Sequence, residues 1–245
     1  LRQNTTGTGN NSFGLQTLDA NTSGDYNTAF GHVALSTNVS SAGNTAFGSQ
    51  VLYAATGARN TGIGDTAGYA ITSGSNNLLL GADAGRTGSP GGNYTSENNA
   101  IVLGDENIAE AQIQVDWTVA SDQRDKTDFT ALDLGLDFVK ALAPVTYKWD
   151  KRSKYGDKTA DDYDLLDQTP DGTHKEDWLD VGFKAQEVEA LEQAAGYNKS
   201  NKTNLMSSHT GDGKQMGLQY SKFIPILVKA MQEQNALIEA LTARI

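Results

Sequence analysis

The sequence predicts a mainly β N-terminal half, residues 1–120, followed by a small α+β domain, residues 121–245. Three observations lead to this fold class: a Gly/Asn/Thr-rich segment that repeats about every 17 residues, an ordinary charged segment after it, and a heptad pattern at the end. We expect the repeats to form a trimeric β-stalk or β-helix and the last segment to form a trimeric coiled-coil helix.

The first half is built on a short motif that ends in glycine. The stretches "NNSFG", "NTAFG", "NTAFG", "NTGIG" and "NLLLG" are spaced by 17, 17, 16 and 17 residues, and "AIVLG" is a sixth, irregular copy. Such self-similarity is typical of stacked architectures in which each unit buries its face only against its neighbours. The pattern leaves open whether one chain coils on itself or three chains wind together. The glycines are Gly14, Gly31, Gly48, Gly64, Gly81 and Gly104.

Each unit is predicted to hold a short strand, a glycine turn, a second apolar position and an Asn/Ser/Gly turn. The second apolar position is leucine in three copies and decays to glycine in the next two. We expect the residue before each strand-ending glycine to point inward, and the asparagine before each strand to supply a positive backbone dihedral or to stack as an amide ladder. The inward stripe is Phe13, Phe30, Phe47, Ile63 and Leu80, and the asparagines are Asn27, Asn44, Asn60 and Asn77.

A calcium-binding repeat is the alternative for this half, because Asp65 and Asp83 lie in "GDTAG" and "GADAG". The period differs from that of the nine-residue calcium β-roll, and the aspartates are not shared by every copy. We therefore expect a structural repeat with no metal site and no cofactor.

Composition argues against several other classes. The net charge is −11, of which residues 1–120 carry −6 (3 basic, 9 acidic) and residues 121–245 carry −5 (16 basic, 21 acidic). A field of this sign repels phosphate backbones, so nucleic acid is not an expected partner. Without cysteine there is no disulfide or thiolate metal site. No apolar run approaches the ~20 residues of a membrane span, so we expect no membrane insertion, and the non-Met start suggests part of a longer chain.

The end of the chain follows a heptad. Pro225 fits the first turn of such a helix, where its missing N–H costs nothing. The pattern suits two or three strands, and the alternative is an amphipathic helix packed on its own domain. Each repeat also has too little apolar surface to be stable alone and needs partners. A parallel homotrimer therefore accounts for both the repeats and the C-terminal heptad. The a positions are Ile224, Met231, Ile238 and Ile245, and the d positions are Leu227, Gln234 and Leu241.

Between these parts the pattern is mixed. We expect a helix that stops before Pro144, a strand in "VTYKW", a long exposed loop over residues 151–178, a strand at Val181–Phe183, a helix through Gln186–Leu191, and a polar hairpin or loop before the last helix.

Four stretches, "SDQRDK", "LAPVTYKW", "VGFKAQEVE" and "LQYSKFIPILVKAMQEQNALIEAL", carry a resemblance over residues 121–245. Their order and spacing resemble the intramolecular chaperone auto-processing domain, an endosialidase-type self-cleaving serine peptidase family at the C-terminus of phage endosialidases, tail fibres and neck appendages. The resemblance implies a trimeric clamp that templates the preceding β-structure, cuts the peptide bond before its own serine and is released.

Carried onto this sequence, the resemblance implies that Ser121 is the nucleophile, Lys126 the general base and Ala120–Ser121 the scissile bond. Asp125, Phe129 and Lys184 depart from the family pattern without removing this Ser/Lys dyad. The supporting candidates are Asp122, Arg124, Gln186 and Glu187, of which the last two also suit the first turn of a helix.

The chemistry of the residues agrees with a dyad. A serine hydroxyl needs a base at neutral pH, and a lysine can serve when burial or positive charge depresses its pKa. We expect the charge of Arg124 to add to that effect. A Ser-His-Asp triad has little support from three scattered histidines. The alternative is that Ser121 caps a turn and Lys126 is a solvated surface lysine.

These inferences predict that the chain is the C-terminal part of a phage tail fibre. Residues 1–120 are expected to serve host adhesion, with a cell-surface receptor or polysaccharide as partner, in the virion. The chaperone is expected to be released in the host cytoplasm during assembly. The alternatives are the end of a capsule-degrading tailspike enzyme, whose active site would lie upstream because carboxylates here are scattered, and a structural trimerisation module that does not cleave.

Overall fold

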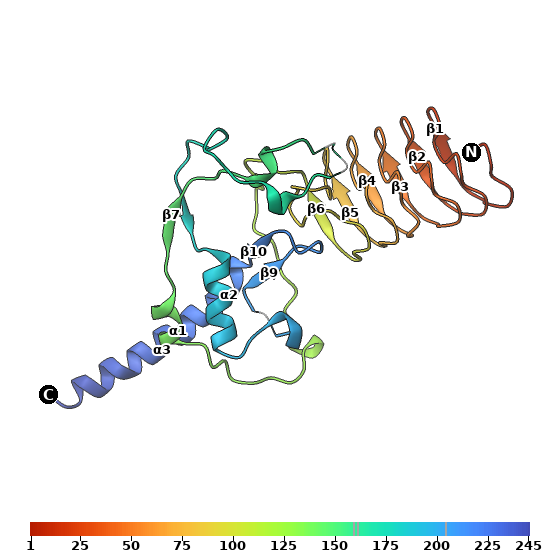
Figure 1. The fold of residues 1–245 in the computed structure, drawn as a ribbon. Helices are drawn as coiled ribbons and strands as arrows, with labels where there is room; N and C mark the ends of the chain where they lie inside the picture. Colours follow the sequence, from red (N-terminus) through yellow and green to blue (C-terminus); the bar gives the residue numbers. More distant parts are fainter. Residues whose placement is uncertain (159, 161, 204) are drawn as a thin grey trace. The chain divides into compact units, whose positions relative to one another are not determined.

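The computed structural model describes residues 1–158, 160, 162–203 and 205–245 (Figure 1). They form two compact units that are interleaved along the chain. Unit 1 comprises residues 1–109, 149–176 and 209–215, and unit 2 comprises residues 110–148, 177–208 and 216–245. Two segments of the second half therefore belong to the unit of the repeats. The predicted domain boundary between residues 120 and 121 stays a prediction.

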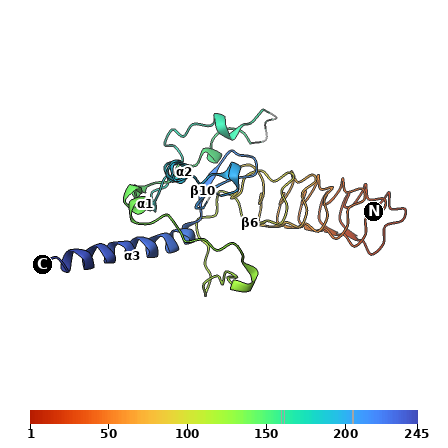
Figure 2. The same ribbon diagram turned by 90° about the horizontal axis from the view of Figure 1, so that it is seen from below.

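Unit 1 is built on a β-solenoid with a single parallel sheet in the strand order β1-β2-β3-β4-β5-β6 (Figures 1 and 2). The register pairs equivalent positions of successive repeats, as with Thr28 opposite Thr45 and Phe30 opposite Phe47. One chain therefore coils on itself. The strands are β1 (Asn11–Phe13), β2 (Thr28–Phe30), β3 (Thr45–Phe47), β4 (Thr61–Ile63), β5 (Leu78–Leu80) and β6 (Ile101–Leu103).

The predicted inward stripe is wrong, because the middle residue of each strand points inward. Ala29 and Ala46 are buried, whereas Phe13, Phe30 and Phe47 are 67%, 41% and 52% exposed. Their rings stack on the outside, with centroids 4.7 and 4.8 Å apart. A three-residue strand alternates out, in, out, so its two outer positions cannot face the core.

The second apolar position of each repeat fills the core instead. Leu18, Leu35 and Leu52 are fully buried and adopt left-handed φ values of 48°, 51° and 50°. This backbone is uncommon for a residue other than glycine, so burial of the leucine side chain offsets the strain. Gly68 and Gly85 take the same backbone in the next two coils, where a Cβ on Gly85 would collide with Leu79. The larger inward residue of β5 thus replaces the lost leucine.

The asparagines before the strands form the predicted amide ladder. The backbone N–H of Asn44 donates to Oδ1 of Asn27, and that of Asn60 donates to Oδ1 of Asn44, both at 2.9 Å. The amide nitrogen of Asn44 donates in turn to the carbonyl of Gly57 at 3.0 Å. All these side chains are buried. The positive dihedral of the turn lies one residue earlier, as at Arg59.

Unit 2 is a small α+β arrangement in which the predicted helices and strands are present, although β8 begins one residue before the strand predicted at Val181–Phe183 and does not include Phe183. Strand β7 pairs with β8 in antiparallel fashion, and β9 and β10 form a second two-stranded sheet. The elements are α1 (Leu136–Ala141), β7 (Val145–Tyr147), β8 (Asp180–Gly182), α2 (Ala185–Ala194), β9 (Ser207–His209), β10 (Met216–Leu218) and α3 (Phe223–Thr242). The core consists of Leu134, Phe138, Val188, Met206, Phe223 and Ile226.

The segment predicted as a long exposed loop is only partly exposed. It contains the 3-10 turns η2 (Arg152–Lys154) and η3 (Leu165–Asp167) and belongs to unit 1 over residues 149–176. Ser153 and Leu165 are buried, with 4% and 1% of their surface exposed. This segment therefore packs within unit 1 despite its polar composition.

Helix α3 uses one face within its own unit and leaves the heptad positions uncovered. Ile226 and Ala230 are buried, whereas Met231 and Ile238 are 69% and 54% exposed. The C-terminal part of the helix extends beyond α1 and α2 in both views (Figures 1 and 2). The helix is confirmed and its coiled-coil partner stays a prediction. No helix within the described residues is long and apolar enough to cross a bilayer.

We expect Asn44→Ala to destabilise unit 1 by about 2–4 kcal/mol, because it leaves the buried N–H of Asn60 and the carbonyl of Gly57 without partners. Thermal or denaturant unfolding followed by circular dichroism measures the change. Asn11→Ala is the matched control, since Asn11 is an exposed strand residue. Equal stability of the two variants would contradict the ladder's role.

Candidate functional site

The side chains of Ser121 and Lys126 meet although they are five residues apart. Lys126 Nζ donates a hydrogen bond to Ser121 Oγ at 2.6 Å. A 3-10 turn, η1 (Gln123–Asp125), reverses the chain between them, and the N–H of Lys126 donates to the carbonyl of Gln123 to close it. The turn that the five-residue spacing requires is therefore present, and the roles of both residues as nucleophile and base stay predictions.

Asp122 and Arg124 build this turn. The carboxylate of Asp122 caps η1 by accepting from the backbone N–H of Arg124, and it pairs with the Arg124 guanidinium at 2.6 Å. The side-chain and backbone hydrogen bonds from Arg124 lower the pKa of Asp122. Since the charge of Arg124 is compensated by this ion pair, its contribution in the single chain is to hold the turn.

The whole segment around the dyad is exposed. Every residue from 107 to 131, Ala120 included, has an exposed side chain, and Trp117 and Val119 just before the predicted cut are 73% and 78% exposed. A lysine becomes a base when its ammonium loses solvation. One chain alone does not provide that loss of solvation at this site.

Gln186 and Glu187 lie in the first turn of α2. Glu187 pairs with Lys184 at 2.7 Å, and within the described residues neither side chain is bonded to Ser121 or Lys126. Their position matches the alternative in which acidic and polar residues suit the start of a helix.

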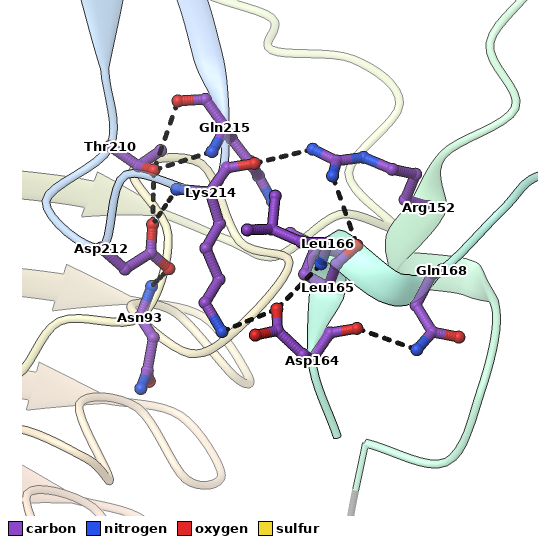
Figure 3. A network of polar contacts seen from close by, with 10 residues as sticks. All are labelled: Asn93, Arg152, Asp164, Leu165, Leu166, Gln168, Thr210, Asp212, Lys214 and Gln215. Atoms are coloured by element: carbon purple, nitrogen blue, oxygen red, sulfur yellow. Dashed lines mark hydrogen bonds and ion pairs between the residues drawn. The ribbon is translucent and has the colours of Figure 1, made fainter. Parts of the chain in front are cut away.

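A second candidate surface lies in unit 1, where residues 149–176 and 209–215 pack on the last coils of the solenoid (Figure 3). The carboxylate of Asp212 accepts the backbone N–H of Asn93 at 3.0 Å. Lys214 pairs with Asp164 at 2.9 Å, and Arg152 donates to the carbonyl of Lys214 at 2.7 Å. These bonds join both segments to each other and to the repeats, and we call them the coil clamp.

A buried ion pair belongs to the same contact. The carboxylate of Glu106, whose side chain is 6% exposed, pairs with Lys158. Lys151 donates to the main-chain carbonyl of Glu106 at 3.0 Å. A buried charge is costly unless it is paired, so Glu106 requires residues 149–176 to remain in place.

Asp212 is the titratable centre of the coil clamp. Burial opposes ionisation of its carboxyl, but hydrogen bonds from the N–H of Asn93, the Thr210 hydroxyl and the N–H of Lys214 outweigh burial and lower its pKa. Its ionised form therefore holds the segments together.

Sequence reasoning missed this clamp and a buried carboxylate in unit 2. Glu192 on α2 is 1% exposed and accepts from the N–H groups of Leu205 and Met206. The signal was its spacing of four residues from Val188, which places it on the apolar face of α2. In the described part of the chain no three acidic or histidine side chains gather as a metal site.

Residues 121–197 match the family model described as chaperone of endosialidase. The match identifies an endosialidase-type intramolecular chaperone domain in this part of the chain, and the family implies a self-cleaving, serine peptidase-like domain. It begins at Ser121, the residue whose hydroxyl accepts the hydrogen bond from Lys126. No curated protein and no solved structure matches the chain.

We expect unit 1 to lose stability as the pH falls. Because the pKa of Asp212 is lower in the folded state, its contribution is complete above the ordinary aspartate pKa of about 3.9 and is lost below it, as the pH approaches the folded value. Asp212→Asn should flatten this acid-side slope in unfolding measured between pH 7 and roughly pH 3.

Asp65→Asn is the control for this measurement, since Asp65 is an exposed residue of the solenoid. An unchanged acid slope in Asp212→Asn would show that the carboxylate does not hold the segments.

Proposed function

We propose that the chain is the C-terminal part of a phage tail fibre, in which residues 121–245 assist folding and trimerisation of the repeats and then cut themselves off between Ala120 and Ser121. The observation that carries this proposal is the 2.6 Å contact between Ser121 Oγ and Lys126 Nζ, at the first residue of the matched chaperone domain.

The proposed reaction proceeds in cis. Neutral Lys126 takes the hydroxyl proton of Ser121 while Oγ attacks the carbonyl carbon of Ala120. The C–N bond breaks, the proton passes to the departing amine of Ser121, and an ester joins the two residues. Water then hydrolyses the ester to leave a carboxylate on Ala120 and free Ser121. Proximity within one chain supplies the effective concentration, and a single turnover is sufficient.

Assembly is the proposed trigger for this reaction. The dyad lies in a segment whose side chains are all exposed in the single chain, and Lys126 Nζ lies 2.6 Å from Ser121 Oγ there. Burial of this segment by further copies removes solvation from the ammonium and favours the neutral base. Cleavage then follows folding, which is the order a folding assistant requires.

The chaperone role is supported by the coil clamp. Parallel coils bury their faces only against neighbours, so the last coils of a solenoid need a cover. Residues 149–176 and 209–215 follow the proposed cut in sequence yet pack on the repeats that precede it. A segment in this position covers and templates the last coils until the cut chaperone is released.

Homotrimer formation is supported by the uncovered heptad positions of α3. Ile224, Met231 and Ile238 are 62%, 69% and 54% exposed, and an exposed apolar seam on a helix is stabilised by parallel copies of itself. In the assembled virion the repeats serve host adhesion through a cell-surface receptor or polysaccharide. The chaperone is released in the host cytoplasm.

Denaturing electrophoresis tests the cleavage. Wild-type protein is expected to give two bands of about half of 26.1 kDa, whereas Ser121→Ala and Lys126→Ala give one full-length band. Lys140→Ala, a variant of an exposed lysine on α1, should cleave normally. A single full-length band from assembled wild type would refute autoproteolysis and favour a structural trimerisation module.

The oligomeric state tests the helix. Light scattering after size exclusion should give three chain masses for uncut Ser121→Ala protein, and adding Met231→Glu should yield monomers, since three carboxylates cannot share an apolar seam. Adding Gln232→Glu at a position outside the seam is the matched control. A trimer that survives Met231→Glu would contradict the proposed coiled coil.

A further inference from the structure

A small polar cavity lies beside the last coils of the solenoid, within unit 1. Its volume is about 230 Å³, below the 300–1,000 Å³ typical of pockets for drug-sized ligands. It is therefore suited to one small ring. The lining includes Tyr69, Asp83, Arg86, Thr87, Asn93 and Lys158.

The walls of the cavity are held rigidly by stacking between coils. The ring of Tyr53 stacks on that of Tyr69 at 5.1 Å, and the guanidinium of Arg86 lies over the ring of Tyr69 at 5.3 Å. Arg86 also donates to Asp83 Oδ1 at 2.6 Å, and Thr66 donates to the same oxygen at 2.6 Å. A site held in this way loses little conformational entropy on binding.

Several hydrogen-bonding groups of these walls are unused. Within the described residues no hydrogen bond involves Asp83 Oδ2, the Thr87 hydroxyl or the side-chain amide of Asn93. Arg86 uses one of its five N–H donors in the Asp83 ion pair. Figure 3 shows the Asn93 side chain pointing away from Asp212. Of the groups of Asn93, only the backbone N–H donates to the Asp212 carboxylate. The cavity thus offers both donors and acceptors.

The charges of the cavity are balanced. Arg86 is paired with Asp83, and Lys158 is paired with the buried carboxylate of Glu106. Since each cation has its own carboxylate, no spare positive charge remains for an anion. Balanced charge with free donors and acceptors matches adjacent hydroxyl groups, each of which both donates and accepts.

We propose that this cavity binds one ring of a neutral saccharide. The inference rests on the proposed adhesive role of the repeats and gives that role a place and a ligand class. All the lining residues except Lys158 belong to the repeats, so release of the chaperone opens one wall of the cavity and leaves its other lining residues on the solenoid.

The test uses uncut Ser121→Ala protein, so that its outcome does not depend on cleavage. Glucose, galactose and N-acetylglucosamine are titrated to roughly 50 mM, which covers the millimolar range in which a single weakly held ring binds, and binding is followed by saturation-transfer NMR. At least one of these sugars is expected to bind. Asn93→Ala should weaken binding at least about fivefold without altering unfolding, because the lost side chain makes no internal hydrogen bond; Asn11→Ala on β1 should bind like the parent.

Two results would overturn the assignment: no binding of any of the three sugars, or equal affinity in Asn93→Ala. Glucuronate is titrated in parallel, and its binding without binding of any neutral sugar would indicate an anion site. Cleavage of the wild-type chain is measured separately by electrophoresis. A failure of the saccharide assignment therefore leaves the autoproteolysis result standing, and the reverse also holds.

Discussion

Hydrogen bonding between successive coils is the constraint on which unit 1 depends. The strand backbone of each coil donates to the next, as from Thr28 to the carbonyl of Asn44 and from Thr45 to that of Asn60, both at 2.8 Å. The asparagine ladder repeats the same connection inside the core. A coil without a neighbour has neither its polar groups satisfied nor its leucine covered, so the solenoid is stable only as a stack. Its ends therefore decide whether the stack forms.

The irregular repeat lies where this end problem is solved. Strands β5 and β6 pair Leu78 with Ile101, a spacing of 23 residues instead of 17. The extra residues supply Asn93 to the coil clamp, and Glu106 follows shortly after β6. The regular coils provide hydrogen-bond partners for one another. The irregular coil carries polar groups whose partners come from the second half of the chain. This copy therefore differs in sequence from the regular repeats because it also contacts residues 149–176 and 209–215.

The sequence predicts features that depend on local geometry. The glycine spacing predicts the coils because the turn backbone recurs in each one. The Ser121–Lys126 pair was predicted from the family resemblance, and the capped turn between the two residues brings their side chains together. The inward stripe is wrong because large apolar residues were assigned to the core, although a short strand with a small middle residue exposes them. The coil clamp was not predictable, since 119 residues separate Asn93 from Asp212 and nothing local in "HTGDGK" distinguishes a clamp from a solvated turn.

Three groups of exposed apolar residues share one property that bears on the proposed trimer. They are regular: stacked rings at Phe13, Phe30 and Phe47, a heptad on α3, and an alternation in "IQVDWTVA" before the proposed cut. Isolated apolar residues are normal on a surface, but periodic ones match a partner with the same period. A second copy of the same chain, aligned in parallel, has the same period. The net charge of −11 opposes such association, so the apolar seams must outweigh the repulsion between copies.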